Sequence, residues 1–299
     1  MTAPASLSRI AIVGAGTMGH GIAQVAAGSG FKVTLVDQDG AALERARARI
    51  EENLAAGIER GKVTAAERDL VRANLTFSRD AVAAAREADL VIEAIVENLA
   101  AKQSLFRELE RAAPAHAILA SNTSSLPIEK IASALARPER SIGMHFFNPV
   151  FLMKLVEIVV HPKTGEAARG AALDVARRMG KEPIVVRDSP GFASSRLGVT
   201  LGLEAIRMVE QNVASPADID RAMELGYNHP MGPLRLTDVV GLDVRLAIAD
   251  TLAAELGGEQ YRAPKLLRDM VARGELGKKS GKGFYDWKQG GPPRLGGGQ

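Results

Sequence analysis

The feature that most constrains the fold of this 299-residue chain is a glycine-rich turn near its start. The β-branched run at residues 10–13 leads into Gly14-Ala15-Gly16-Thr17-Met18-Gly19, and a helix-like stretch follows to Ala27. In a strand–turn–helix unit, the first glycine permits the tight turn, the second lets backbone amides approach a pyrophosphate, and the third lets the helix pack on the strand. The helix N-terminus adds partial positive charge. We therefore predict a dinucleotide-binding turn formed by Gly14, Gly16, Thr17, Met18 and Gly19.

An acidic residue ends the next predicted strand. Asp37 follows the apolar run at residues 33–36 and lies 23 residues after Gly14. A carboxylate at this place accepts hydrogen bonds from the ribose hydroxyls of a bound dinucleotide. Gln38 and Asp39 follow it, so a 2′-phosphate would meet negative charge, and the sequence favours NAD over NADP. The alternative is a surface turn of glycines with a solvated aspartate.

Short apolar runs alternate with longer helical stretches over the first two thirds of the chain. This alternation predicts a doubly wound, Rossmann-type α/β domain over residues 7–188. The expected strands are 10–13, 33–36, 90–96, 118–120, 142–147, 155–160 and 184–186. Uneven connections between the last three leave room for an antiparallel edge. After a turn-rich break the strand pattern stops, which predicts an all-helical domain over 189–287 and a disordered glycine- and proline-rich tail over 288–299. The expected helices of this domain are 195–211, 216–225, 243–256 and 264–273, and Ser215-Pro216 indicates a helix start with the serine as its cap.

The composition excludes several classes of function. The chain has no cysteine, which removes disulfides, zinc fingers, iron–sulfur clusters and thiol nucleophiles, and its five scattered histidines suggest no metal site. A net charge of +3 and an aromatic content of 4% give no basis for nucleic-acid binding. There is no apolar run long enough for a membrane span and no signal-peptide pattern at the start, so we expect a cytoplasmic protein without membrane contact.

A histidine and a glutamate stand on two consecutive predicted strands. His145 lies near the end of one strand, and Glu157 lies 12 residues later, after a turn that contains Asn148 and Pro149. Such a layout can bring the imidazole and the carboxylate into hydrogen-bonding contact. The carboxylate would then fix the ring tautomer, and the imidazole could take a proton from a substrate hydroxyl. From these residues alone, a buried structural histidine and an ordinary surface acid remain equally good explanations.

Several sequence blocks together carry a more specific signal. They are Val13-Gly14-Ala15-Gly16-Thr17-Met18-Gly19, Glu93-Ala94-Ile95-Val96-Glu97-Asn98, Ser121-Asn122-Thr123-Ser124-Ser125, the block around His145, Asp188-Ser189-Pro190-Gly191-Phe192, His229-Pro230-Met231-Gly232-Pro233 and Gly281-Lys282-Gly283-Phe284-Tyr285. With these blocks the chain resembles the L-3-hydroxyacyl-CoA dehydrogenase family, in particular its bacterial 3-hydroxybutyryl-CoA members. The resemblance extends from Ile10 to about Trp287.

The resemblance assigns roles to residues around His145. It implies that His145 is the catalytic acid and base, that Glu157 is its carboxylate partner, and that Ser124 binds the reacting oxygen and so touches the substrate. Asn122 lies on the same loop, and we count it among the cofactor-binding residues. The loop could instead be a polar cap on the helix that follows it.

The resemblance also implies contacts farther from the chemistry. Glu97 and Lys102 match positions that contact the cofactor, and Asn53 and Arg60 match substrate positions on a helical region that meets coenzyme A. A solvated strand end for Glu97 and an exposed helix face for Asn53 and Arg60 are the alternatives. The family pattern further implies a homodimer formed through the C-terminal helical domain.

The chain departs from the commoner family pattern at Ser195. Many members have asparagine there, and its amide helps to hold the substrate. A serine hydroxyl is shorter and has one donor rather than two. We include Ser195 with the catalytic set as a substrate contact, and the alternative is that it caps a helix that starts near Arg196.

The sequence therefore predicts an NAD-dependent oxidoreductase that interconverts (S)-3-hydroxyacyl-CoA and 3-ketoacyl-CoA, with 3-hydroxybutyryl-CoA and acetoacetyl-CoA as the expected pair. Two alternatives stay open. One is a dehydrogenase of a free hydroxy acid or sugar acid on the same scaffold, and the other is a catalytically silent dinucleotide-binding protein.

Overall fold

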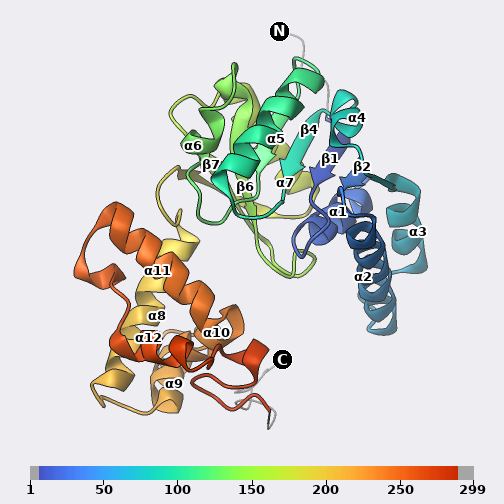
Figure 1. Ribbon diagram of the computed structural model, residues 1–299. Helices are drawn as coiled ribbons and strands as arrows, with labels where there is room; N and C mark the ends of the chain where they lie inside the picture. The colour runs from blue at the N-terminus through green and yellow to red at the C-terminus, as the bar shows by residue number, and fades with distance from the viewer. Residues whose placement is uncertain (1–6, 289–299) are drawn as a thin grey trace. The chain divides into compact units, whose positions relative to one another are not determined.

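One eight-stranded sheet organises the first part of the chain in the computed structural model, which describes residues 7–288 (Figure 1). The strand order is β3-β2-β1-β4-β5-β6-β7-β8. The strands are β1 (Arg9–Val13), β2 (Lys32–Val36), β3 (Leu75–Ser78), β4 (Leu90–Glu93), β5 (Ile118–Ser121), β6 (Ser141–Phe146), β7 (Leu155–Val160) and β8 (Glu182–Arg187). All neighbours are parallel except β6 and β7. The predicted doubly wound sheet is confirmed, and its antiparallel pair lies one strand inside the edge.

The strand β3 does not match any strand predicted from the sequence. Its residues, Leu75 to Ser78, alternate apolar and polar side chains and are half-buried or exposed, as befits an edge strand. The predicted strands were recognised as continuous apolar runs, which is the pattern of strands buried on both faces. An edge strand of four residues does not carry that signal.

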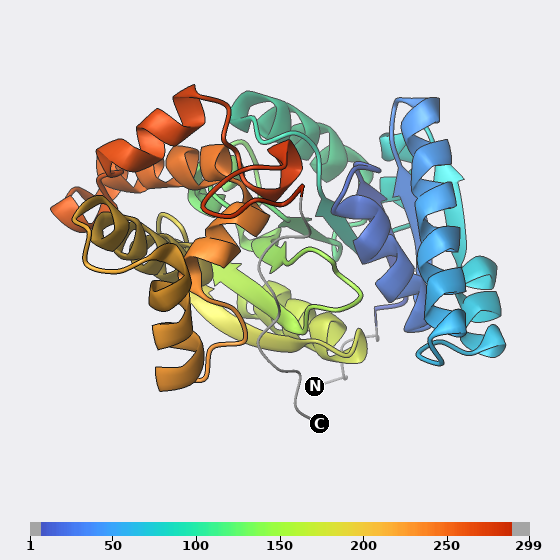
Figure 2. The same ribbon diagram turned by 90° about the horizontal axis from the view of Figure 1, so that it is seen from below.

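Helices cover both faces of the sheet, as Figure 1 and the turned view in Figure 2 show. They are α1 (Gly19–Gly28), α2 (Gly40–Glu59), α3 (Ala65–Asn74), α4 (Ala81–Arg86), α5 (Leu99–Ala112), α6 (Ile128–Ala132) and α7 (Glu166–Arg178). Alternate residues of β1 belong to two separate cores: Ile10 and Ile12 pack in the cluster with α1, α2 and α7, and Ala11 and Val13 pack with α4, α5 and α6. The sheet is therefore buried on both faces, which explains its continuous apolar runs.

The second compact unit begins at Pro190 and is helical. Its helices are α8 (Ser194–Glu210), α9 (Pro216–Gly226), α10 (Pro233–Val240), α11 (Leu242–Leu256) and α12 (Lys265–Ala272). Ser215 caps α9 as the sequence predicted, because its side chain accepts from the backbone N–H of Asp218. The short helix α10 was not predicted. Between Pro190 and Lys288, β-pairing is limited to two isolated bridges, Gly277 with Lys282 and Lys282 with Asp286.

Within residues 7–288, no helix is both long and apolar enough to cross a membrane. The same residues contain no group of three or more His, Asp or Glu side chains that could hold a metal ion. The predicted tail 288–299 lies, apart from Lys288, outside the described residues.

Candidate active site

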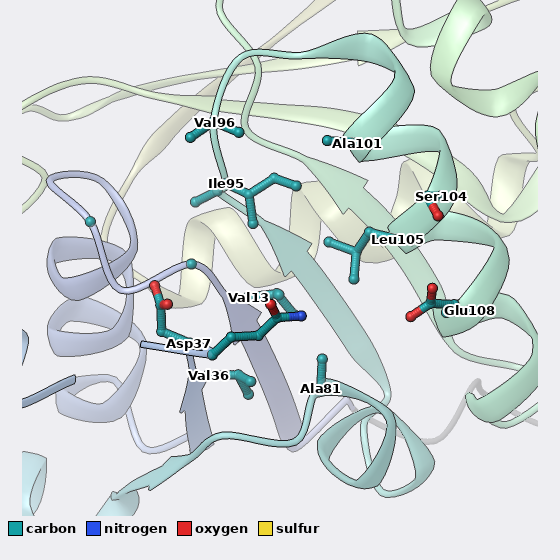
Figure 3. Close-up of a pocket in the computed structure, with 14 residues that line it drawn as sticks. Val13, Val36, Asp37, Ala81, Ile95, Val96, Ala101, Ser104, Leu105 and Glu108 are labelled. Carbon is teal, nitrogen blue, oxygen red and sulfur yellow. The ribbon is translucent and has the colours of Figure 1, made fainter. Parts of the chain in front are cut away.

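A cavity of about 490 Å³ lies at the carboxyl ends of β1 and β4, where the strand order reverses direction. Ligands of doubly wound sheets bind at such a switch point. Figure 3 shows the cavity, which is lined by Val13, Gly14, Gly16, Val36, Asp37, Gln38, Ala81, Ala94, Ile95, Val96, Ala101, Ser104, Leu105 and Glu108. We call it the dinucleotide cavity.

The glycines of the turn have the three separate roles that their spacing predicts. Gly14 has φ of +108°, and a Cβ there would overlap the backbone carbonyl of Ala94. A Cβ on Gly19 would overlap the carbonyl of Gly14, so helix α1 can begin there only without a side chain. A Cβ on Gly16 would meet nothing within 4 Å, and this residue lines the cavity. The space that a ligand's phosphates need is therefore open beside Gly16.

Asp37 borders the dinucleotide cavity at the end of β2, opposite Glu108 of α5 (Figure 3). Its two carboxylate oxygens accept from the backbone N–H groups of Ala15 (2.8 Å) and Asp39 (3.0 Å). The carboxylate thus fixes the glycine turn as well as facing the cavity. The fold also brings Arg79 to this end of the site, where its Nε donates to the Gln38 carbonyl at 3.1 Å. Arg79 is far from Asp37 in the chain, so the residues that directly follow Asp37 do not reveal this cation.

The cavity fits NAD by these observations: an open approach to the turn backbone at Gly16, apolar walls from Val13, Val36 and Leu105, and a carboxylate at the end of β2. The other two predicted turn residues, Thr17 and Met18, do not line it. Thr17 is exposed, and Met18 occupies the position before α1 and faces the neighbouring cavity described next.

A second cavity, of about 330 Å³, is lined by two of the predicted catalytic residues, Ser124 and His145. It is lined by Met18, Ala94, Ile95, Glu97, Lys102, Asn122, Ser124, His145, Phe146, Phe147 and Asn148. We call it the His145 cavity. Ala94 and Ile95 line both cavities, so the turn after β4 separates the two compartments. Asn148, which precedes the cis peptide bond to Pro149, was not predicted as a site residue.

His145 and Glu157 form a buried pair. They are register partners on the antiparallel strands β6 and β7, and His145 Nδ1 lies 2.7 Å from Glu157 Oε2. The Glu157 side chain is fully buried, and 8% of the His145 side chain is exposed. The Phe147 ring lies 4.5 Å from the imidazole, centroid to centroid. The contact expected from the sequence is therefore present, because the connection of residues 147–154 between the two antiparallel strands sets a register that places His145 directly opposite Glu157.

The loop after β5 carries Asn122 and Ser124 into the His145 cavity. Asn122 is buried, and its Oδ1 accepts from the backbone N–H of Phe146 at 2.9 Å. This bond ties the loop to the strand of His145. Ser124 is half-buried, and its backbone N–H donates to Glu97 Oε1 at 3.2 Å.

Lys102 and Glu97 also line this cavity, but Lys102 is buried and paired with two carboxylates, which the sequence did not predict. Only 1% of its side chain is exposed, and its Nζ contacts Glu93 Oε1 at 2.5 Å and Glu97 Oε2 at 3.2 Å. Glu93 was not predicted as a site residue, because an acid at the end of an apolar strand has no distinguishing local pattern. It lies where the strands β4 and β5 end side by side.

The predicted coenzyme A contacts lie elsewhere on the first unit. Asn53 is in α2, and its amide donates to Gln24 Oε1 of α1 at 3.1 Å, so it helps to pack the two helices. Arg60 is exposed at the C-terminal end of α2. Neither residue lines the dinucleotide cavity or the His145 cavity.

Ser195 lies in the first turn of α8, within the second unit. The helix begins at Ser194 with Ala193 as the capping residue, and the side chain of Ala193 makes no capping hydrogen bond. The alternative that Ser195 caps the helix is therefore wrong, because the helix begins earlier than the sequence suggested and already includes this residue.

Comparison with known proteins agrees with this geometry. Residues 9–189 match the family model for the NAD binding domain of 3-hydroxyacyl-CoA dehydrogenase, and residues 191–287 match the model for its C-terminal domain. The chain is 45% identical over 284 residues to a 3-hydroxybutyryl-CoA dehydrogenase of Mycobacterium tuberculosis, covering 94% of this chain and 99% of that protein. It is 42% identical over 296 residues to the human mitochondrial hydroxyacyl-coenzyme A dehydrogenase, covering 94% and 92% of the two chains.

A solved structure gives the same result. The (S)-3-hydroxybutyryl-CoA dehydrogenase of Ralstonia eutropha superposes with a TM-score of 0.90 at 40% identity, covering 94% of this chain and 99% of that one. Matches to both domain models and to relatives over nearly their whole length leave one conclusion. The chain belongs to the 3-hydroxyacyl-CoA dehydrogenase family.

Proposed function

We propose that this protein interconverts (S)-3-hydroxyacyl-CoA and 3-ketoacyl-CoA, with 3-hydroxybutyryl-CoA and acetoacetyl-CoA as its preferred pair. The observation that carries the proposal is the buried His145–Glu157 contact in a cavity that shares the turn after β4 with the dinucleotide cavity. The names of the relatives from M. tuberculosis and R. eutropha support the four-carbon substrate. The direct test is NADH oxidation on addition of acetoacetyl-CoA.

In this proposal His145 moves the proton. Glu157 accepts the Nδ1–H of the ring, which leaves Nε2 as the nitrogen that takes the hydroxyl proton during oxidation and returns it during reduction. The buried carboxylate fixes that tautomer and stabilises the imidazolium that forms. Ser124 donates to the reacting oxygen. Bound NAD supplies the acceptor, and NADH the donor, of the hydride.

The cofactor preference follows from Asp37. We expect the wild-type protein to use NADH strongly in preference to NADPH, because a 2′-phosphate would meet the Asp37 carboxylate. Asp37→Ala should reduce the preference for NADH over NADPH, mainly by weakening the binding of NADH. Arg79 contacts Gln38 beside this position and could attract the 2′-phosphate of NADPH once the aspartate is gone. Comparing Asp37→Ala with the double variant Asp37→Ala/Arg79→Ala separates this attraction from the repulsion by Asp37. Steady-state kinetics with both cofactors measure the ratio, and equal use of NADPH by the wild type would disprove the role of Asp37.

Ser195 is proposed as a substrate contact. We expect Ser195→Ala to lower kcat/KM for acetoacetyl-CoA several-fold, which corresponds to the loss of one neutral hydrogen bond of about 1 kcal/mol. Ser195→Asn, which restores the commoner family residue, should retain the activity. Because Ser195 does not cap α8, the melting temperature should stay unchanged in both variants. A lower melting temperature with unchanged kcat/KM would show that the role is structural.

The two alternatives predict different assay results. A dehydrogenase of free hydroxy acids would reduce acetoacetate as well as it reduces acetoacetyl-CoA. A silent dinucleotide-binding protein would bind NADH and turn over neither. Asn53 and Arg60 remain proposed coenzyme A contacts, and Arg60→Ala with a measured KM for acetoacetyl-CoA tests the exposed one. Comparing acyl-CoA substrates of different length gives the chain-length preference.

We further propose a homodimer that forms through the helical unit, in the cytoplasm. Five large apolar side chains of this unit are exposed on α8, α10 and α11. They are Leu197, Leu236, Val239, Val240 and Val244. Exposed apolar residues in such number support an interface with a second copy. The mass in solution, measured by light scattering, tests the dimer.

A further inference from the structure

Glu93 is a fully buried carboxylate at the carboxyl end of β4, and three donors from three different parts of the first unit surround it. Its Oε1 accepts from Lys102 Nζ at 2.5 Å and from the backbone N–H of Ile95 at 2.7 Å. Its Oε2 accepts from Ser121 Oγ at 2.6 Å. One side chain thus joins helix α5, the turn after β4 and the end of β5.

Lys102 extends this set of contacts toward the surface of the cavity. Its ammonium lies between the buried Glu93 carboxylate and the Glu97 carboxylate, whose side chain is 38% exposed. Although burial on its own would raise the pKa of Glu97, the Thr123 hydroxyl and the Lys102 charge hold that pKa below its usual value. Glu97 is therefore ionised at neutral pH.

Glu97 in turn holds the loop that carries Ser124. Its Oε1 accepts from the Thr123 hydroxyl at 2.5 Å, the Ser124 N–H at 3.2 Å, the Ser125 N–H at 3.2 Å and the Ser125 hydroxyl at 2.9 Å. Four donors on one oxygen require that oxygen to stay in place. Its place depends on Lys102, which contacts the other oxygen of the same carboxylate.

Both ends of this network reach the proposed chemistry. Ile95, bound to Glu93 through its backbone, lines both cavities together with Ala94. Ser124, at the other end, lines the His145 cavity. A group of buried charges is seldom the most stable solution, because apolar side chains of the same volume are often neutral or more stable. Such a group is more readily explained by the geometry that it imposes.

We propose that Glu93 is a positioning residue of this enzyme: it fixes Lys102 and the turn after β4, and through Lys102 and Glu97 it sets the position of Ser124. The proposal rests on the proposed function, since it concerns the turn beside the cofactor and the loop that holds the reacting oxygen. Glu93 touches neither cavity itself, and its effect is transmitted by charge-assisted hydrogen bonds, which are the stronger class.

The first variant is Glu93→Gln, which keeps the size of the side chain and removes its charge. Without the carboxylate, the Lys102 ammonium is drawn toward Glu97, and the Glu97 oxygen that holds residues 123–125 shifts with it. We expect kcat to fall by about tenfold or more, since sub-ångström misplacement of reacting groups has effects of this size. NADH affinity, measured by fluorescence titration without substrate, should fall about threefold through the displaced turn.

Lys102→Met completes a double-mutant cycle. If Glu93 acts through Lys102, the double variant Glu93→Gln/Lys102→Met should lose no more activity than Lys102→Met alone, because the network is already broken. The double variant also removes the unpaired buried charge and should fold at least as well as either single variant. It therefore keeps the test valid if Glu93→Gln proves unstable.

Glu110→Gln is the matched control. Glu110 is on α5, the helix that carries Lys102. Its carboxylate accepts from the backbone N–H groups of Ala136 and Arg137, away from both cavities. Its variant should keep wild-type kcat and NADH affinity. If wild-type protein fails to oxidise NADH with acetoacetyl-CoA, the proposed function is wrong. If the wild type is active, the positioning role is overturned by a Glu93→Gln variant within twofold of wild type, or by losses that simply add in the double variant.

Discussion

Replacing His145 with glutamine is expected to lower kcat for acetoacetyl-CoA reduction by about 10²–10⁴-fold, the usual contribution of a general acid–base group. Glutamine is similar in size to histidine and keeps a polar group in the cavity, but its amide cannot carry a proton to or from the substrate oxygen. The side chain belongs to the His145 cavity and not to the dinucleotide cavity. NADH affinity should therefore stay within about twofold of the wild type, which is a smaller change than the loss of one hydrogen bond would cause.

His161 provides a matched control for this variant. It is also buried, and its Nε2 lies 2.9 Å from the Ser141 hydroxyl, at the opposite end of β6 from His145. His161→Gln removes a buried imidazole that contacts the same strand without touching either cavity, so it should lower the melting temperature and keep kcat. Single-turnover kinetics with pre-bound NADH measure the chemical step directly. If His145→Gln kept a rate within a few-fold of wild type, His145 would not be the proton carrier.

The predicted strands and helices could be recognised because neighbouring residues in the sequence carry their pattern. Strands buried on both faces are continuous apolar runs, and α9 begins with a serine cap and a proline. The edge strand β3 and the eight-residue helix α10 lack such patterns, and the partners that stabilise them come from distant parts of the chain. The strand β3 is held by its hydrogen bonds to β2, and its own four residues carry no pattern that predicts this pairing.

The same distinction between local and distant partners applies to the site. The His145–Glu157 contact was predictable because the two residues oppose each other across one connection between strands. The contacts of Glu93 were not, because Lys102, Ile95 and Ser121 are brought to it from a helix, a turn and a neighbouring strand. The bond of Asn53 is a similar case: its amide donates to Gln24 of the adjacent helix, a contact between helices that no local pattern in the sequence indicates.

The largest expected effect on stability is at Asp238 of α10. Its carboxylate is fully buried and accepts from the backbone N–H groups of Phe284 (2.9 Å) and Tyr285 (3.0 Å) and from the indole N–H of Trp287 (2.8 Å). Asp238→Ala leaves three donors without their acceptor, and we expect it to lower the free energy of unfolding of the helical unit by about 3–5 kcal/mol. Trp287 is the only tryptophan of the chain, so its fluorescence during urea unfolding reports on this unit.

Asp250→Ala is the control for that measurement. Asp250 pairs with Arg268 on the surface of the same unit, and both side chains are about half exposed, so its loss should change the free energy of unfolding by less than about 0.5 kcal/mol. Asp238→Asn should fall between the two, because an amide oxygen can still accept while the amide NH₂ faces a donor. A loss below about 1 kcal/mol for Asp238→Ala would mean that water replaces the carboxylate at little cost.

The same carboxylate explains why glycine stands at position 283, and this gives a sharper test of Asp238. A Cβ on Gly283 would overlap the Asp238 carboxylate, so Gly283→Ala forces that group away from the N–H donors of residues 284 and 285. In an Asp238→Ala background the obstructing oxygens are gone, and the added methyl group should have little further effect. The two losses are therefore expected to be strongly non-additive, with a coupling of about 1–3 kcal/mol in a double-mutant cycle. Additive losses would show that glycine is required at position 283 for a reason other than the position of Asp238.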